Sequence, residues 1–259
     1  MLRRACKKII RLLMLGILSA AAIWAAYLSA SLSLQLPTEA HINEFTNVGE
    51  TLSFAERRSV IRSRSSTVQV MSLDVMDGGI SISSGTYIYY QDHHLILTTS
   101  HGVGPMCDFT QIVVGKDLYD CKAYVLRDME TDYLIMEIAP LPDREPVRLP
   151  LQSPRHGEWK RDLAIQNTIF YTGFPNQGGP YTFTGRIVGY NQAQAIFVDS
   201  YGWSGSSGGG VFSASGNLIG WVRALEVGET YFGREVLENF IWVVPLFNVD
   251  WPAVGAFVD

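Results

Sequence analysis

The sequence has few cysteines and none of the clusters that bind metals or carry out redox chemistry. Its 259 residues include three cysteines, and no Cys-x-x-Cys pair occurs among them. No group of His, Cys, Asp and Glu residues has the spacing of metal ligands. An internal repeat of solenoid period is missing as well. These absences argue against thiol redox catalysis, a metal enzyme and a repeat protein, so we expect neither a metal nor a cofactor.

Charged residues are also sparse, and positive charge is in deficit over most of the chain. Charged side chains make up 17% of the residues and hydrophobic ones 47%, which is typical of a globular protein rather than a disordered one. After residue 37 there are 15 basic and 25 acidic residues, a net charge of about −10. A body of this charge repels phosphate groups, so we expect no nucleic-acid partner.

Acidic residues are absent from residues 1–37, which have the pattern of a targeting segment. Residues 12–34 form a mostly apolar run of 23 residues without a charge. A signal-peptide core has about 7–15 residues and a membrane span about 20, so the length favours an uncleaved membrane anchor. The small residues at 29–31 leave cleavage, and hence secretion, as the alternative. The basic residues before the run are Arg3, Arg4, Lys7, Lys8 and Arg11.

The charge asymmetry of this segment also predicts its orientation. Positive charge next to a membrane span stays in the cytoplasm. Everything after Gln35 is therefore predicted to lie outside the cytoplasm, in a periplasmic, extracellular or luminal space.

Beyond a linker at residues 38–57, the pattern predicts short β-strands. Five prolines between Pro140 and Pro154 divide the strands into two sets and indicate an inter-domain connection. Short strands at this spacing are typical of barrels or sandwiches, and residues 247–257 are compatible with a terminal helix. The predicted strands are 67–73, 80–85, 86–90, 95–99, 111–114, 121–126 and 133–138, then 168–172, 182–189, 195–199, 211–212, 218–222 and 240–244.

A run rich in glycine and serine, residues 205–210, carries the strongest chemical signal. Such a run forms a poor helix or strand, but it forms a loop whose N–H groups can point at a ligand. An acyl-transfer enzyme needs such a loop. The loop carries a hydroxyl that acts as the nucleophile, and two of its amide N–H groups bind the oxyanion. The alternative is a flexible Gly/Ser turn.

The order of residues along the chain limits which catalytic arrangement is possible. No histidine follows Ser207, which excludes the Ser…Asp…His order of α/β-hydrolases although Gly205-x-Ser207-x-Gly209 fits their motif. Two orders remain, His…Asp…Ser and Asp…His…Ser, and the second would need an α/β sheet that the short strands do not support. His101 is the best candidate base because it ends an apolar strand and begins a loop. The other histidines lie in linker-like sequence or a polar turn: His41, His93, His94 and His156.

Asp132 is the best candidate for the acid that orients the base. It stands at the start of the largely apolar strand predicted at 133–138, where a carboxylate is partly buried and needs a partner. An imidazole N–H would satisfy it and would leave the other ring nitrogen free to accept a proton. Asp128 better fits the alternative, a turn aspartate that caps its own backbone.

At this point the chain resembles the trypsin-like serine proteases of chymotrypsin fold, and most closely their HtrA-type branch. The matching segments run in order from about residue 58 to 247. Ser84 to His101 resembles "GSGFII…ILTNxHV", Asp128 to Ile138 resembles "DxxTDLAVLKI", and Val198 to Gly210 resembles "TDAxxxxGNSGGP". Shorter matches are Thr172-Gly173-Phe174-Pro175 with Thr184 to Gly189, Gly216 to Gly220, and Ile241 to Pro245.

The resemblance implies an all-β fold of two antiparallel six-stranded β-barrels, residues 58–149 and 150–259. It also assigns roles to matching positions: Ser207 as nucleophile, His101 as general base and acid, Asp132 as orienting carboxylate, and the N–H groups of Gly205 and Ser207 as the oxyanion hole. Further candidates follow with it. Tyr201, Trp203, Val222 and Arg223 are predicted to shape the primary pocket. Independently of the resemblance, Cys107 and Cys121 are both predicted to be exported to an oxidising compartment and to lie in the same barrel, so we expect them to form a disulfide.

Several positions depart from the family pattern. Ser206 stands where secreted trypsin-like enzymes carry an aspartate that pairs with a freed N-terminus, so that activation is not expected. Gly210 replaces the usual proline, and no peptide-binding PDZ domain is recognisable. The sequence leaves the oligomeric state open. We therefore expect a membrane-anchored serine endopeptidase acting on polypeptides; the alternative is a catalytically inactive protease-fold binding module.

Overall fold

The computed structural model describes residues 51–74, 78–149, 161–191, 195–231 and 233–258, together with Met14, Gly16, Ser19 and Gly49. The chain divides into two compact units, Met1–Asn47 and Val48–Asp259, and the second is described by itself below. The predicted anchor at 12–34 lies outside the described residues except for three positions. Among the helices that are described, none has the length and apolar character needed to cross a membrane.

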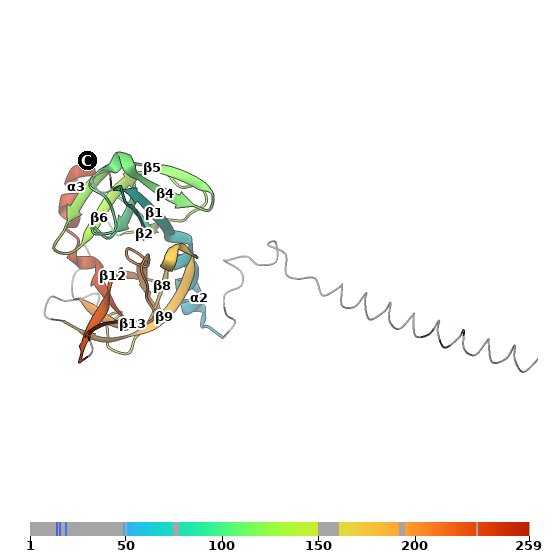
Figure 1. The fold of residues 1–259 in the computed structure, drawn as a ribbon. Helices are drawn as coiled ribbons and strands as arrows, with labels where there is room; N and C mark the ends of the chain where they lie inside the picture. The colour runs from blue at the N-terminus through green and yellow to red at the C-terminus, as the bar shows by residue number, and fades with distance from the viewer. Residues whose placement is uncertain are drawn as a thin grey trace, which may run out of the picture. The chain divides into compact units, whose positions relative to one another are not determined.

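The first barrel is a ring of six antiparallel strands with one short strand added. The ring runs β1-β4-β5-β6-β3-β2 and closes through pairing of β1 with β2, while β7 pairs parallel with β2. Figure 1 shows this barrel in teal to green. Its strands are β1 Thr67–Leu73, β2 Ile80–Tyr90, β3 His93–Thr98, β4 Thr110–Val114, β5 Asp117–Asp128, β6 Tyr133–Ile138 and β7 Val147–Arg148.

The second barrel is a closed ring of six antiparallel strands in the order β10-β13-β12-β11-β8-β9. It is drawn in yellow to red in Figure 1. Its strands are β8 Thr168–Gly173, β9 Tyr181–Tyr190, β10 Ile196–Asp199, β11 Gly210–Ser213, β12 Leu218–Thr230 and β13 Gly233–Pro245. The predicted all-β fold of two six-stranded barrels is confirmed.

Two helices flank the barrels. α2, Phe54–Ser66, begins at a capping box in which the Ser53 side chain accepts from the Glu56 N–H and the Glu56 side chain accepts from the Ser53 N–H. It therefore occupies residues that the sequence analysis divided between linker and barrel. α3, Trp251–Val258, lies within the tail for which a terminal helix was expected. Short 3₁₀ turns lie at η1 Cys107–Phe109, η3 Pro175–Gln177 and η4 Leu246–Asn248.

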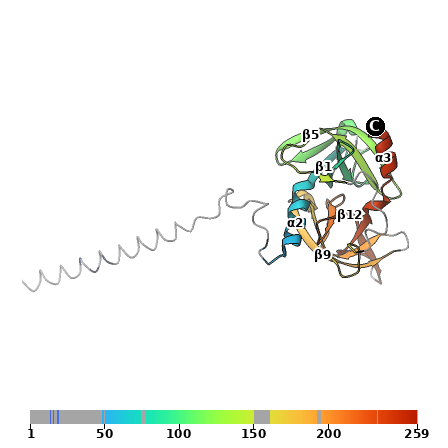
Figure 2. The ribbon, with the colours of Figure 1, turned by 180° about the vertical axis from the view of Figure 1, so that it is seen from behind.

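The tail after the second barrel returns to the first. Figures 1 and 2 both show α3 beside the first barrel, near β5. Trp251 is buried, its ring lies 5.1 Å from that of Tyr90 in β2, and the Tyr90 hydroxyl donates to its carbonyl. The N–H of Asp250 donates to the hydroxyl of Tyr133 in β6. Through these contacts the tail, which follows the last strand of the second barrel, is bound to the first barrel.

Two local predictions differ from the structure. His93 and His94 belong to β3 rather than to the turn, because Gln91 and Asp92 make the turn alone with positive φ values of 45° and 64°. The His94 ring instead contacts the Tyr87 hydroxyl. β12 and β13 are also much longer than predicted. Their far ends form a protruding hairpin whose exposed faces lack the apolar alternation that marks a barrel strand.

Two cysteines lie next to each other in the first barrel. Cys107 in η1 and Cys121 in β5 form a disulfide with Cα atoms 5.4 Å apart. The bond ties the loop before β4 to the β4–β5 hairpin.

Candidate active site

His101 and Asp132 form a close pair at one end of the first barrel. β3 and β6 are neighbours, with Thr98 opposite Leu134, so the loop after β3 meets the residue before β6. The His101 Nδ1 lies 2.7 Å from the Asp132 Oδ2, and the His101 main-chain N–H donates to Oδ1 at 3.0 Å. The Asp132 side chain is 7% exposed and that of His101 is 51% exposed. The strand register therefore presents an accessible imidazole backed by a buried carboxylate.

Asp132 is held by more than the histidine. Its backbone has φ of 64°, and its carbonyl accepts from the Trp221 Nε1 at 3.3 Å. Asp128, by contrast, accepts from the N–H groups of Glu130 and Thr131 in the preceding turn. This is the turn-capping role that the sequence analysis gave to Asp128.

Arg223 places a cation beside the same carboxylate. Its Nε lies 3.4 Å from the Asp132 Oδ2, and its side chain is one-third exposed. Burial raises the pKa of Asp132, but hydrogen bonds from His101 and the charges of His101 and Arg223 outweigh burial, so that pKa lies below its usual value. The carboxylate is therefore ionised at neutral pH.

The loop that carries His101 is fastened by an arginine at the end of β5. The Arg127 guanidinium donates to the carbonyls of Ser100, Val103 and Gly104 and to the Ser100 hydroxyl, at 2.7 to 2.9 Å. Bonds from one planar group to three carbonyls fix the path of the chain on both sides of His101.

The loop 204–210 keeps three backbone donors unused in the described part of the chain. The N–H of Ser206 donates to the Trp203 carbonyl, that of Gly208 to Val222, and that of Gly209 to Ser206. Within the part of the chain that the structure describes, the N–H groups of Ser204, Gly205 and Ser207 have no acceptor. Those of Gly205 and Ser207, separated by one residue, are thus two amide donors that are not committed to the fold.

The three serines of this loop differ in exposure. Ser204 is exposed, Ser206 is 1% exposed and its hydroxyl accepts from the Trp203 N–H at 3.3 Å, and Ser207 is partly exposed. Among the described residues, neither the Ser207 hydroxyl nor the His101 Nε2 has a hydrogen-bond partner. Both groups remain available to a reactant.

Two glycines in the loop are required by close approaches. Gly205 has φ of 98°, and a Cβ there would lie 2.4 Å from the Phe174 carbonyl oxygen. Gly208 has φ of 89°, and a Cβ there would lie 2.0 Å from the Ser84 carbonyl oxygen. Any side chain would push the loop away from the neighbouring backbone.

Hydrogen bonds to β12 bring this loop next to the His101–Asp132 pair. Val222 of β12 forms two hydrogen bonds with the loop. The Gly208 N–H donates to the Val222 carbonyl, and the Val222 N–H donates to the Gly209 carbonyl. The residues on either side of Val222 are Trp221 and Arg223, and both contact Asp132.

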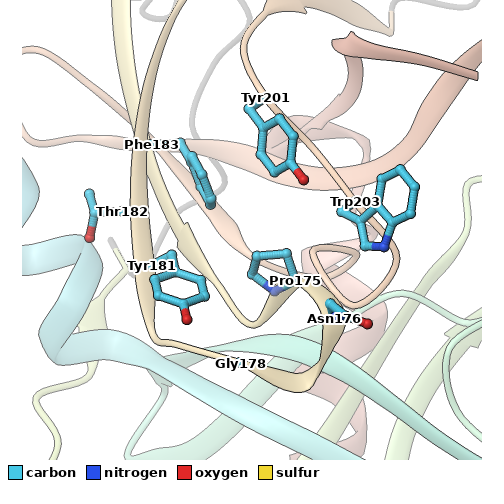
Figure 3. Close-up of a pocket in the computed structure, with 8 residues that line it drawn as sticks. All are labelled: Pro175, Asn176, Gly178, Tyr181, Thr182, Phe183, Tyr201 and Trp203. Carbon is cyan, nitrogen blue, oxygen red and sulfur yellow. The ribbon is translucent and has the colours of Figure 1, made fainter.

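The four residues predicted for the primary pocket do not line one described cavity. Tyr201 and Trp203 line a pocket of about 720 Å³. Figure 3 shows their rings across from Tyr181 and Phe183 of β9. Val222 is 1% exposed, and Arg223 contacts Asp132 instead. The other lining residues are Pro175, Asn176, Gly178 and Thr182.

Two contributors to the site were not found from the sequence, and a third was given another role. Arg127 was not singled out, Ser84 was only part of a motif match, and Arg223 was predicted to shape the pocket but contacts Asp132. A residue pattern alone does not show which carbonyls or carboxylates a long side chain reaches after folding. Among the described residues, no three His, Cys, Asp or Glu side chains gather as a metal site would require.

Comparisons with known proteins give a consistent result. Residues 83–220, more than half of the chain, match the family described as "Trypsin-like peptidase domain". A comparison with curated proteins gave no significant match. Solved structures with a similar fold include three proteases.

The first is a serine endoprotease from Yersinia pestis, with a TM-score of 0.56, 17% identity, and coverage of 75% of this chain and 63% of that one. The second is the HtrA-type protease AlgW with a tripeptide, with a TM-score of 0.54, 18% identity, and coverage of 73% of this chain and 59% of that one. The third is the Rv3671c protease from M. tuberculosis in its active form, with a TM-score of 0.54, 16% identity, and coverage of 77% of this chain and 82% of that one. The chain thus spans less than two thirds of the first two structures, and at these identities the likeness concerns the fold. Because the family match covers most of both barrels and includes His101, Asp132 and Ser207, the chain belongs to the trypsin-like peptidase family.

Proposed function

We propose that Ser207, His101 and Asp132 form the catalytic triad of this peptidase and that the chain hydrolyses peptide bonds through an acyl-enzyme. The observation that carries the proposal is the 2.7 Å contact between His101 Nδ1 and the buried Asp132 carboxylate. The contact fixes the imidazole with its proton on Nδ1 and leaves Nε2 as the base.

In the first step the Ser207 Oγ attacks the substrate carbonyl carbon and its proton passes to His101 Nε2. Negative charge develops on the substrate oxygen, and the N–H groups of Gly205 and Ser207 are the donors in reach of it. Loss of one such donor typically costs about 10²–10³ in rate. The Asp132 carboxylate stabilises the imidazolium that forms.

In the second step the C–N bond breaks and His101 gives its proton to the leaving amine. A water molecule then attacks the ester, again with His101 as base, and Ser207 regains its proton as the acid product leaves. Proton transfer by a positioned imidazole contributes about 10²–10⁴ to the rate. The cycle returns every group to its starting state and consumes no cofactor.

A covalent probe tests this assignment directly. A fluorophosphonate reporter should label the folded protein, and Ser207→Ala should abolish labelling. Ser204→Ala is the matched control, because it removes an exposed hydroxyl from the same loop and should label like wild type. If well-folded wild-type protein does not react, the chain is an inactive protease-fold binding module instead.

We also propose that the catalytic unit is tethered to a membrane by residues 12–34 and faces away from the cytoplasm. The support is the length of the apolar run and the basic residues before it. A protease added to cells whose outer barrier has been opened, but whose cytoplasmic membrane is intact, should digest the catalytic unit. Digestion only after the cytoplasm is exposed would contradict the orientation.

A further inference from the structure

Ser84, in β2 of the first barrel, contacts the nucleophile loop of the second barrel with both its main chain and its side chain. It lies two residues before the last paired position of β2 with β3, where Thr86 stands opposite Leu97. Its backbone is therefore free of that ladder. The Ser84 N–H donates to the Ser207 carbonyl at 2.9 Å, and its own carbonyl accepts from the Thr98 hydroxyl at 2.7 Å.

The Ser84 hydroxyl is fully buried and uses both of its hydrogen-bonding roles. It donates to the Gly205 carbonyl at 2.7 Å and accepts from the Phe174 N–H at 2.9 Å. One hydroxyl thereby joins the loop that contains Phe174 to the loop that contains Ser207.

Two of these bonds end on the carbonyls of Gly205 and Ser207, whose N–H groups have no acceptor in the described part of the chain. Gly205 has no side chain to limit its backbone, so hydrogen bonds to the adjacent peptides decide its orientation. The Asn176 N–H donates at 2.7 Å to the Ser204 carbonyl, in the peptide that carries the Gly205 N–H. Ser84 holds the next carbonyl, that of Gly205. Each peptide is a rigid plane, so the Asn176 bond orients the peptide that carries the free Gly205 N–H, and the Ser84 bond orients the next peptide, on the other side of the Gly205 Cα.

We propose that Ser84 is a positioning residue that holds the Gly205 and Ser207 amides in the geometry needed to stabilise the oxyanion. The inference rests on the proposed function of these amides. Ser84 does not touch the substrate and acts through the two carbonyls. Without the Ser84 hydroxyl, the peptide that follows Gly205 would be free to turn and the backbone angles of Gly205 would be less fixed. The oxyanion would then lose part of its stabilisation in the transition state.

The test measures fluorophosphonate labelling of full-length protein at several probe concentrations, which separates the maximal inactivation rate from the probe's apparent affinity. Ser84→Ala should lower the maximal rate about 10- to 100-fold, somewhat less than direct loss of an oxyanion donor. The apparent affinity should change less than about threefold, because the probe's binding contacts are intact. If Ser84 only supported the fold, its loss would not lower the maximal inactivation rate while leaving the apparent affinity nearly unchanged.

The neighbouring serine provides a matched control. Ser83 is 3% exposed, and its hydroxyl has no hydrogen-bond partner among the described residues. Ser83→Ala makes the same change one residue away and should label at the wild-type rate within about twofold. Ser84→Cys keeps a weak donor and should fall between wild type and Ser84→Ala.

Each outcome decides the matter. A folded Ser84→Ala protein that labels at the wild-type maximal rate overturns the inference, as does a change confined to affinity. If Ser84→Ala does not fold, Ser84→Cys decides by the same two parameters. Wild-type protein that fails to label would instead overturn the proposed function, so the two failures are distinct.

Discussion

Single residues set the electrostatics of the site. Asp132 carries its charge in a nearly buried position because three positive or polar groups face its two oxygens. Breaking a buried pair by removing one partner leaves an uncompensated charge, which is more costly than losing an exposed ion pair. The contribution of each partner is therefore measurable as a change in acid stability.

The acid stability of an Arg223→Gln variant is the first prediction. The pKa of Asp132 is held below its usual value, so its contribution to stability is present above about pH 4 and is lost as the pH falls through the lower native value. Removing the Arg223 charge raises the pKa of Asp132 in the folded protein. The acid-unfolding midpoint should move upward by a few tenths of a pH unit, and about 0.3–1 kcal/mol should be lost at pH 7 after solvent screening.

Acid titration followed by circular dichroism measures both effects. Arg186→Gln is the control, because Arg186 is an exposed arginine of β9 in the second barrel. An unchanged midpoint in Arg223→Gln, or an equal change in the control, would show that the Arg223 contact contributes nothing.

Pairs of elements decide where the reactive residues meet. The β3–β6 register brings His101 to Asp132, and the Gly208–Val222 bonds bring the serine loop to β12. The start of β11 is equally constrained. A Cβ at Gly210 would lie 2.6 Å from the Thr86 Oγ1 and 2.9 Å from its Cγ2. The glycine that departs from the family's proline therefore fits a threonine of β2.

Gly210→Ala should consequently destabilise the protein by about 1–3 kcal/mol through overpacking against Thr86. Thr86→Ala removes both clashing atoms, so the double variant should recover most of the loss even though the Thr86 bond to the Gly208 carbonyl disappears. Urea unfolding of the four proteins gives the coupling energy. Purely additive effects would mean that the contact is not the cause.

At the scale of the whole molecule, the two barrels are joined by polar and apolar connections. α2 binds the second barrel through hydroxyls, with Ser59 donating to the Ser213 carbonyl and Ser63 to the Thr172 hydroxyl. α3 binds the first barrel through Trp251 and its neighbours. The candidate active-site residues come from both barrels, so these joints support the candidate site as well as the fold.

Trp251→Ala should lower the free energy of unfolding by about 3–5 kcal/mol, because it removes a fully buried side chain between the tail and β2. Phe257→Ala, in the same helix but 53% exposed, should change stability by less than about 0.5 kcal/mol. Thermal and denaturant unfolding measure both. Equal effects of the two changes would show that α3 does not join the barrels through Trp251.

The sequence by itself determined the fold class and the candidate site residues. Short alternating strands predicted an all-β protein, and the order His101, Asp132, Ser207 excluded the competing hydrolase arrangement. These features are local or depend on chain order, so they can be read without coordinates. The boundaries of α2 and the length of the β12–β13 hairpin were harder, because a helix packed through serine hydroxyls and an exposed hairpin both lack the usual apolar period.

Only the tertiary structure decided the supporting contacts. Arg223 reaches Asp132 rather than a pocket, Arg127 holds three carbonyls, and Ser84 bonds to residues more than 120 positions away. Such contacts depend on the strand register and on how the two barrels meet. Neither is encoded in the residues nearby in sequence, so the geometry around the predicted serine became visible only after the chain was folded.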